Sequence, residues 1–360
     1  MVVKIAINGF GRIGRLVFRA IRQRYPTECQ VVAIHDLCDI KTNSYLLRYD
    51  SAHRTFAEEV KVNEADSTMT IGEGASQWVV KVLGGRLGPS ELPWKEMGVD
   101  VVLESTGIFR RKAVVNYGKV EKDGYDGHII AGAKKVLLSV PSADEIECTL
   151  VLGVNDEDLK PETKCISNAS CTTNCLGPVA KTINNAFGVI NGFMTTVHSY
   201  TNDQVVADTM HSDLRRARAA AMNIIPTSTG AAIALPKVCH GLPPKSLDGF
   251  ALRVPTITGS LVDVTFNVKA VVTKEEVNAA LKKATEEGSL KGIMSYTTDP
   301  IVSTDIIGNQ YSSIVDGLST KVLPNPEGFG TLVKVLSWYD NEWMYSCRCA
   351  DIFHLLGKYL

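Results

Sequence analysis

Residues 2–14 read Val-Val-Lys-Ile-Ala-Ile-Asn-Gly-Phe-Gly-Arg-Ile-Gly, an apolar run that leads into Gly9, Gly11 and Gly14. The apolar run predicts a buried strand, and the spacing of apolar residues from Arg15 to Arg24 predicts a helix after the turn. In such a unit the first glycine permits a tight turn, the second lets the backbone approach a diphosphate, and the third lets the helix pack closely on the strand. Free N–H groups at the start of the helix favour an anion. This stretch therefore predicts a dinucleotide-binding fold.

A second apolar run, residues 31–34, ends at His35 and Asp36. Asp36 stands about 20 residues after Gly14, where a carboxylate can bind the adenosine ribose. Its charge would repel a 2′-phosphate, which favours NAD over NADP. A G-x-G-x-x-G motif also arises by chance in a chain with 29 glycines, so three turn glycines without a nucleotide are the alternative. Strand, glycines, helix, strand and acid in this order favour the nucleotide.

Two later apolar runs, Val99–Glu104 and Lys135–Ser139, also lead into segments with small or hydroxyl residues. Carboxyl ends of parallel strands meet at one edge of a sheet, where a cofactor lies. Taken singly, each such Ser or Thr is more often a turn residue or a helix cap. The candidate cofactor contacts of this half are Asn8, Gly9, Gly11, Arg12, Ile13, Gly14, Asp36, Ser105, Thr106, Gly107 and Ser139.

The second half contains a candidate nucleophile. In Ser167-Asn168-Ala169-Ser170-Cys171, Ser170 can cap a helix that starts near Cys171. The free N–H groups and the dipole of a first helical turn stabilise a thiolate. His198 ends an apolar strand 27 residues later and is a candidate base, although a single histidine is more often structural. The chain has no C-x-x-C or His-x-x-x-His pair, so we expect no zinc site.

The bulk composition limits the class of protein. A chain of 360 residues is long enough for two domains, and 45% hydrophobic with 21% charged residues is ordinary for a globular protein. No apolar run reaches the ~20 residues of a membrane helix. A net charge of −1 gives no reason to expect nucleic acid as the main partner. Nine cysteines without a secretion signal lead us to expect a cytoplasmic protein with reduced thiols.

Several motifs together resemble phosphorylating glyceraldehyde-3-phosphate dehydrogenase, and the resemblance is collinear from residue 3 to about residue 350. They are the glycine motif, residues 167–175, His198-Ser199-Tyr200-Thr201, residues 226–232, residues 252–256 and residues 338–343. The resemblance implies an α/β Rossmann domain over residues 1–170 and an α+β catalytic domain over 171–336 with a mostly antiparallel sheet. Its strands would include 187–199, 249–253, 260–272 and 330–338, and a helix over 343–356 would pack back on the first domain.

The same resemblance implies a glycolytic enzyme that uses NAD and inorganic phosphate to convert D-glyceraldehyde 3-phosphate to 1,3-bisphosphoglycerate through a thioester on Cys171, with His198 as the base. It assigns Thr201 and Arg253 to the substrate phosphate, and Ser170, Thr172, Thr229 and Gly230 to the attacking phosphate. It also implies that Asn341 and Tyr345 contact the nicotinamide, and that residues 203–222 line a neighbouring subunit's cofactor pocket in a homotetramer. Without the resemblance, the basic run in 215–218 is typical of a solvated helix face.

The chain departs from the family pattern at a few positions. Met344 stands where glycine is usual, and its side chain could crowd the loop or point to solvent. Thr209-Met210 replaces a Leu-Pro pair common in NAD-specific members, which weakens the preference for NAD, while Cys347 and Cys349 are additional thiols near the end. The charged stretch Lys119–His128 is several residues longer than usual, and we expect a surface loop there.

Two other functions stay open at this point. Erythrose-4-phosphate dehydrogenase shares the fold, the cysteine and the histidine, but Tyr200-Thr201 favours the triose enzyme. A non-catalytic role in RNA binding is the other alternative, and the net charge of −1 does not favour it.

Overall fold

The computed structural model describes residues 2–325, 327 and 330–360 and divides the chain into two compact units. The first unit comprises the described residues of Met1–Leu150, Glu157–Ala169 and Ser346–Leu360. The second comprises those of Val151–Asp156 and Ser170–Tyr345. Among the helices in the described parts of the chain, none is long and apolar enough to cross a membrane.

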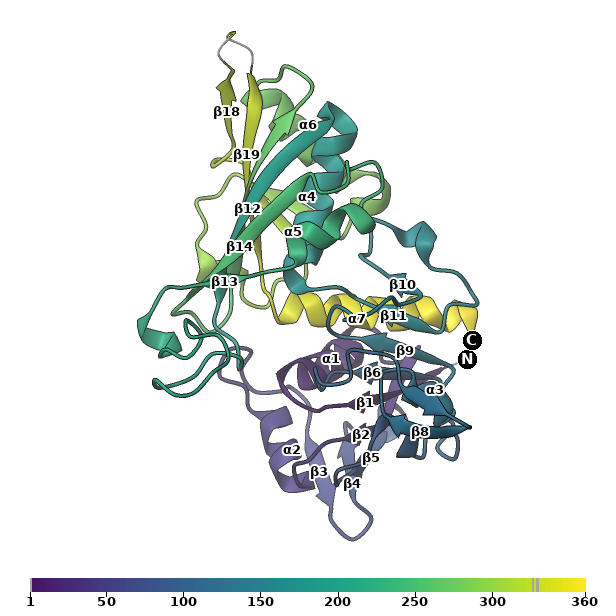
Figure 1. Cartoon of the computed structure of the whole chain (residues 1–360). Helices are drawn as coiled ribbons and strands as arrows, with labels where there is room; N and C mark the ends of the chain where they lie inside the picture. The colour runs from purple at the N-terminus through teal and green to yellow at the C-terminus, as the bar shows by residue number, and fades with distance from the viewer. Residues whose placement is uncertain (1, 326, 328–329) are drawn as a thin grey trace. The chain divides into compact units, whose positions relative to one another are not determined.

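The first unit is built on a nine-stranded sheet in the order β10-β11-β9-β6-β1-β2-β5-β4-β3 (Figure 1). Its strands are β1 (Val3–Asn8), β2 (Cys29–His35), β3 (Val60–Asn63), β4 (Thr68–Ile71), β5 (Trp78–Leu83), β6 (Val101–Glu104), β9 (Lys135–Leu138), β10 (Cys148–Thr149) and β11 (Cys165–Ser167). The strands from β10 to β5 run parallel, whereas β4 and β3 extend one edge of the sheet and each pairs antiparallel with its neighbour. The order reverses at β1, between β2 and β6, which is the crevice where doubly wound sheets bind nucleotides. The predicted Rossmann fold is confirmed.

Helix α1 (Arg12–Arg24) follows β1 and buries Leu16, Val17, Ala20 and Ile21 on one face. It begins at Arg12, earlier than the predicted Arg15, because Gly11 takes the N-cap position although it has no side chain to mark it. The other helices of this unit are α2 (Ile40–Arg48), α3 (Gly127–Ile130) and the part of α7 (Trp343–Leu356) that starts at Ser346. An ion pair of 2.7 Å between Arg24 and Asp351 joins α7 to α1 within the unit.

The expectation of a surface loop over Lys119–His128 is correct about the surface position of Lys119–Lys122 but wrong about the loop. The strands β7 (Val114–Asn116) and β8 (Lys119–Lys122) form a hairpin, and His128 lies fully buried in α3. Tyr117 and Gly118 connect the two strands with φ of 47° and 75°. Positive φ at both central residues is the geometry of a tight two-residue hairpin turn, which the sequence pattern had not indicated.

The second unit holds an eight-stranded sheet in the order β13-β14-β12-β15-β19-β17-β16, with β18 paired to β19. Its strands are β12 (Val189–Ser199), β13 (Ile225–Ser228), β14 (Leu247–Val254), β15 (Ser260–Val268), β16 (Met294–Thr297), β17 (Ser313–Asp316), β18 (Lys321–Pro324) and β19 (Gly330–Tyr339). Among the described pairings only β12–β14 and β16–β17 are parallel, so the predicted mostly antiparallel sheet is confirmed. β15 ends at Val268, before the predicted residue 272.

The helices of the second unit are α4 (Cys171–Phe187), α5 (Ala231–Ala234) and α6 (Lys274–Glu286). α4 packs against β12, β15, β17 and β19, and α6 lies beside it (Figure 1). Gly188, with φ of 69°, ends α4, so β12 starts at Val189 and not at the predicted Phe187. This packing fixes the first turn of α4 against the end of β12.

Candidate active site

The glycine turn at the end of β1 has the geometry that a bound dinucleotide requires. Gly9 has φ of 92°, and a Cβ there would lie 2.6 Å from the Thr106 backbone nitrogen. A Cβ at Gly14 would lie 2.2 Å from the Gly9 carbonyl oxygen, whereas a Cβ at Gly11 would meet nothing within 4 Å. The first glycine thus permits the turn, the third permits close packing, and the second leaves the backbone open to a diphosphate.

The other predicted cofactor residues of the first unit surround this turn. Asp36 accepts hydrogen bonds from the Phe10 backbone N–H (2.7 Å) and the Cys38 backbone N–H (2.9 Å). Ser105 Oγ donates to the Gly9 carbonyl (2.7 Å), and Arg12 forms an ion pair with Asp50 (3.1 Å). The remaining positions are Asn8 at the end of β1, Ile13 in α1, Thr106 and Gly107 after β6, and Ser139 after β9. The structure therefore brings this set to one edge of the sheet.

The first turn of α4 presents the Cys171 thiol. Ser170 is the N-cap, and its Oγ accepts from the Thr173 backbone N–H at 3.1 Å, so the predicted cap is confirmed. Cys171 is the first helical residue, beside the N–H groups that favour a thiolate. Ala169 has φ of 50°, a left-handed conformation that costs a non-glycine residue about 1 kcal/mol or more and that is common at functional sites.

The structure brings His198 to Cys171. His198 Nε2 lies 3.4 Å from Cys171 Sγ, and His198 Nδ1 lies 2.6 Å from the Ser199 carbonyl oxygen. A carbonyl oxygen only accepts, so Nδ1 carries the proton and donates it to this bond. The lone pair of Nε2 therefore faces the thiol, as a base for Cys171 requires.

Arg253 lies beside His198 because β12 and β14 pair in parallel with His198 opposite Arg253. Its Nη1 donates to the Ser199 carbonyl (2.9 Å) and lies 2.8 Å from His198 Nδ1, since both donors share that acceptor. Its buried Nε has no hydrogen-bond partner, and no carboxylate in the described part of the chain lies within ion-pair distance of it. A half-buried guanidinium without an anionic partner is suited to an anionic ligand.

Burial and Arg253 determine the charge state of the pair. Burial and then the Arg253 cation lower the pKa of His198 to about 3, so the imidazole is neutral at physiological pH. Burial also raises the pKa of the Cys171 thiol, opposed by the Arg253 cation and the backbone N–H of Thr172. The unliganded pair is therefore a neutral thiol and a neutral imidazole.

Tyr339 at the end of β19 is a site residue that the sequence analysis missed. Its hydroxyl is hydrogen-bonded to Thr172 Oγ1 (2.9 Å) and Thr196 Oγ1 (2.8 Å), and its ring meets the His198 ring edge-on with centroids 6.0 Å apart. Burial holds the pKa of Tyr339 well above its ordinary value. Tyr339 falls within the motif of residues 338–343, which is the signal that could have found it.

Asn341 is held in one orientation by the ends of two strands. Its Oδ1 accepts hydrogen bonds from Ser199 Oγ (2.9 Å), Ser260 Oγ (2.8 Å) and the Gly259 backbone N–H (3.2 Å). The amide nitrogen is therefore the group that faces away from these donors. The contact of Asn341 with a nicotinamide carboxamide, whose oxygen accepts, stays a prediction.

Other predicted residues lie outside the hydrogen-bonded cluster around Cys171. The Thr201 backbone N–H donates to Gln204 Oε1 (2.8 Å), and Thr229 Oγ1 accepts from the Ala231 backbone N–H (3.3 Å), next to Gly230 at the start of α5. Tyr345 is buried, and so is Met344, which corrects the alternative that Met344 points to solvent. Cys347 and Cys349 are also fully buried.

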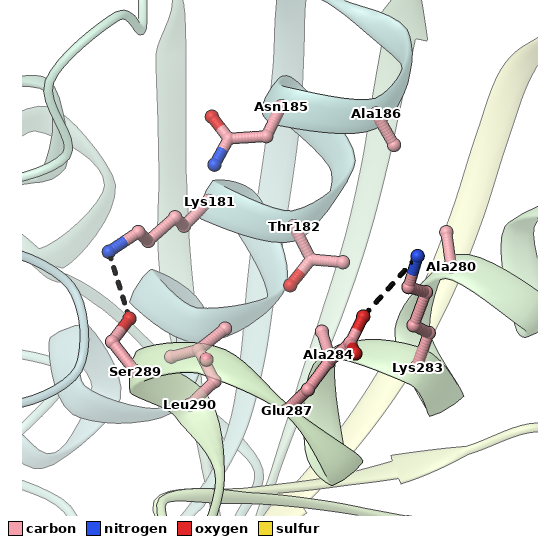
Figure 2. A pocket seen from close by; sticks show the side chains of 11 residues that line it. Lys181, Thr182, Asn185, Ala186, Ala280, Lys283, Ala284, Glu287, Ser289 and Leu290 are labelled. Atoms are coloured by element: carbon pink, nitrogen blue, oxygen red, sulfur yellow. Dashed lines mark hydrogen bonds and ion pairs between the residues drawn. The ribbon is translucent and has the colours of Figure 1, made fainter.

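A groove on α4, separate from Cys171, is lined by residues of α4, α6 and the following turn. Figure 2 shows Lys181 pointing to Ser289 (3.2 Å) and Lys283 to Glu287 (3.3 Å). Lys181 lies ten residues after Cys171, hence about 15 Å along the helix axis. The ammonium of Lys181 also donates to the Gly153 carbonyl (2.8 Å), so this lysine has hydrogen-bond acceptors within the protein. None of the predicted site residues lines the groove.

The described side chains include no group of three or more His, Cys, Asp or Glu residues that could hold a metal ion. The organic cofactor has a matching site, because the open backbone at Gly11 and the Asp36 carboxylate lie at the switch point of the sheet.

Comparisons with known proteins agree with this geometry. The family model for the glyceraldehyde 3-phosphate dehydrogenase NAD binding domain matches residues 3–112, and the model for its C-terminal domain matches residues 170–341. The glyceraldehyde-3-phosphate dehydrogenase of Borreliella burgdorferi is 52% identical over 358 residues, which cover 99% of this chain and 100% of the relative. The enzyme of Mycolicibacterium smegmatis is 48% identical, and the match covers 100% of both chains. The enzyme of Xanthobacter flavus is 50% identical, and the match covers 99% of both chains. The chain belongs to the glyceraldehyde-3-phosphate dehydrogenase family.

Proposed function

We propose that the chain catalyses the glycolytic oxidation of D-glyceraldehyde 3-phosphate with NAD and inorganic phosphate, which yields 1,3-bisphosphoglycerate. The observation that carries this proposal is the thiol–imidazole pair of Cys171 and His198, 3.4 Å apart at the capped start of α4. Relatives named for this activity match the chain over its whole length. A reduced thiol also fits a cytoplasmic location, and the described cysteines form no disulfide with one another.

In the proposed reaction the Cys171 sulfur adds to the aldehyde carbon while His198 Nε2 takes the thiol proton, which forms a thiohemiacetal. The Cys171 backbone N–H and His198 stabilise the oxygen as negative charge develops on it. His198 returns the thiol proton to this oxygen, which gives the neutral thiohemiacetal, and it takes the hydroxyl proton back as the hydride leaves the carbon and the thioester forms. A bound NAD would supply the hydride acceptor. Inorganic phosphate held by Ser170, Thr172, Thr229 and Gly230 then attacks the acyl carbon and releases the thiolate. The thioester keeps the acyl group activated for that transfer.

We propose that Asn8, Gly9, Gly11, Arg12, Ile13, Gly14, Asp36, Ser105, Thr106, Gly107 and Ser139, with Asn341 and Tyr345, bind NAD. We also propose that residues 1–170 with helix 343–356 form the NAD domain and residues 171–336 the catalytic domain. The division of the contacts near residue 170 supports this boundary.

We propose a homotetramer, with residues 203–222 lining a neighbouring subunit's cofactor pocket. Large apolar side chains are exposed in this segment (Met210 and Leu214), just before β13 (Ile224) and on β12 and β14 (Phe193 and Phe250). Exposed apolar patches of this kind mark protein–protein contacts.

The test of the proposed function is formation of NADH from glyceraldehyde 3-phosphate, followed by absorbance. We expect turnover that depends on inorganic phosphate and on NAD. Erythrose 4-phosphate and NADP, assayed in parallel, should give lower kcat/KM, because the relatives named here give no support to the erythrose enzyme and Asp36 repels a 2′-phosphate. A higher kcat/KM for erythrose 4-phosphate, or turnover independent of phosphate, would contradict the proposal.

Replacement of Arg253 by alanine should raise KM for glyceraldehyde 3-phosphate by about 10- to 100-fold, the scale of charge-assisted hydrogen bonds. KM for unphosphorylated glyceraldehyde should change little, because that aldehyde has no phosphate for Arg253 to bind. Any effect of the lost cation on the pKa values of His198 and Cys171 applies to both aldehydes, so the ratio of the two KM changes isolates phosphate recognition. Equal changes for both aldehydes would exclude this role, and Arg253→Lys should restore part of the affinity.

A further inference from the structure

Asn341 lies where the ends of three neighbouring strands of the second unit meet. It follows the last residue of β19 by two positions, and its side chain contacts Ser199 at the end of β12 and Ser260 at the start of β15. Strand β15 pairs with both β12 and β19, so the strand register brings these residues together. Ser199, Ser260 and Asn341 are each at most 5% exposed, so water has little access to replace either serine hydroxyl.

The Gly259 backbone N–H determines which atom of the Asn341 amide faces these serines. An N–H only donates, so the atom 3.2 Å from it is the amide oxygen Oδ1, because a reversed amide would set two N–H donors against each other. The two hydroxyls then donate to the same oxygen, Ser199 Oγ at 2.9 Å and Ser260 Oγ at 2.8 Å. Among the described residues every hydrogen bond of this side chain goes to Oδ1, which leaves the Nδ2 protons for a ligand.

Ser199 also holds the proposed base, through a different group. Its backbone carbonyl accepts from His198 Nδ1 at 2.6 Å, whereas its hydroxyl donates to Asn341. Ser260 Oγ supports this arrangement, because it accepts from the Ser199 backbone N–H (3.2 Å) and keeps its own proton for Asn341. Ser199 therefore joins the side chain that faces the Cys171 thiol to the side chain that is proposed to contact the nicotinamide.

We infer that Ser199 and Ser260 are cofactor-positioning residues, which hold Asn341 as a hydrogen-bond donor toward the carbonyl oxygen of the nicotinamide carboxamide. Without the two hydroxyls, only the Gly259 N–H would oppose rotation of the amide, because Thr258 Oγ1 lies 3.5 Å away and gives its proton to a neighbouring carboxylate. A site that is correctly arranged in only a fraction of the molecules binds its ligand more weakly by that fraction. This inference rests on the proposed binding of NAD.

The experiment measures the Kd of three ligands by isothermal titration calorimetry on the full chain. They are NAD, ADP-ribose, which lacks the nicotinamide, and 3-acetylpyridine adenine dinucleotide, whose acetyl group has a carbonyl oxygen but no N–H. In Ser199→Ala and in Ser260→Ala, the Kd of NAD should rise by about three- to tenfold, the scale of one hydrogen bond, and the Kd of ADP-ribose should not change. The double variant should show a larger rise for NAD.

The acetylpyridine dinucleotide tests the direction of the hydrogen bond. Its Kd should rise at least as much as that of NAD, because both ligands offer the same carbonyl oxygen to Asn341 Nδ2, and only the carboxamide of NAD can turn and donate to a reversed amide. If its Kd stays at the wild-type value while that of NAD rises, the contact is made by the carboxamide nitrogen, and the inference is wrong.

Ser313→Ala is the matched control. Ser313 is a fully buried serine on β17 of the same sheet, and its hydroxyl donates to the Cys175 carbonyl, away from Asn341. All three Kd values should stay at the wild-type level in this variant. The rate of Cys171 alkylation by iodoacetamide reports on the second unit itself, and it should be unchanged in Ser199→Ala, because the carbonyl that holds His198 remains.

An unchanged Kd for NAD in the double variant would overturn the inference, and so would equal rises for NAD and ADP-ribose. A rise for NAD together with a changed alkylation rate would also overturn it, because the hydroxyls would then support the fold of the unit and not Asn341 specifically. If the double variant does not fold, the single variants decide, since each keeps one serine donor besides Gly259. Wild-type protein that does not bind NAD would contradict the proposed function instead.

Discussion

Replacement of Cys171 by serine is expected to lower kcat for NAD reduction by at least about 10⁴-fold, to the background of the assay. A hydroxyl holds its proton far more tightly than a thiol, and the pKa of His198, lowered to about 3, makes the imidazole too weak a base to remove it. An ester, even if formed, would also be a less activated acyl donor than a thioester. The measurement is NADH formation from glyceraldehyde 3-phosphate at saturating NAD and phosphate.

The matched control for this variant is Cys175→Ser, one turn further along α4. Cys175 is fully buried, and its Sγ donates to the Ser337 carbonyl at 3.6 Å, a bond that a serine hydroxyl can also make. Its activity should therefore stay close to wild type. Cys171→Ser should still bind NAD, because the first unit builds the glycine turn from its own residues. Retained turnover in Cys171→Ser would contradict the proposed role of Cys171 as the nucleophile.

The fold of the first unit could be predicted from residues 2–36 because its determinants are local. A continuous apolar run, three glycines and a second run ending in Asp36 specify a strand, a turn and a helix within one short segment. The start of α1 could not be placed, since Gly11 caps it through backbone conformation alone. The hairpin at Tyr117-Gly118 was missed for a similar reason, because Tyr rarely adopts a positive φ.

Only part of the site could be predicted from the sequence, because its geometry depends on the register between strands. The capped position of Cys171 is local and was predicted, whereas the approach of Arg253 to His198 requires the parallel pairing of β12 with β14. The two bonds of the Tyr339 hydroxyl bring together β19, α4 and β12, which no spacing within the chain reports.

Replacement of His198 by asparagine is expected to lower kcat by about 10²- to 10⁴-fold, the usual contribution of a positioned general base. Because its pKa is lowered to about 3, His198 is neutral at every pH from about 4 upward, so its ability to accept a proton does not change between pH 5 and pH 9. The pH dependence of thiol reactivity should therefore come from the raised pKa of Cys171, and reactivity should increase with pH.

Alkylation of Cys171 by iodoacetamide separates this role from substrate binding, since the reagent is small and uncharged. In a Cys175→Ser background, mass spectrometry of the peptide that contains Cys171 gives the rate at that thiol alone. His198→Asn should be alkylated more slowly near neutral pH, because asparagine can accept a hydrogen bond from the thiol but cannot take its proton. The alkylation rates of the two proteins should converge at high pH, where hydroxide removes the thiol proton and His198 is no longer needed as a base. An unchanged rate at neutral pH would mean that the contact of 3.4 Å holds the imidazole in place without activating the sulfur, and His198 would then act only on the hydroxyl proton of the thiohemiacetal.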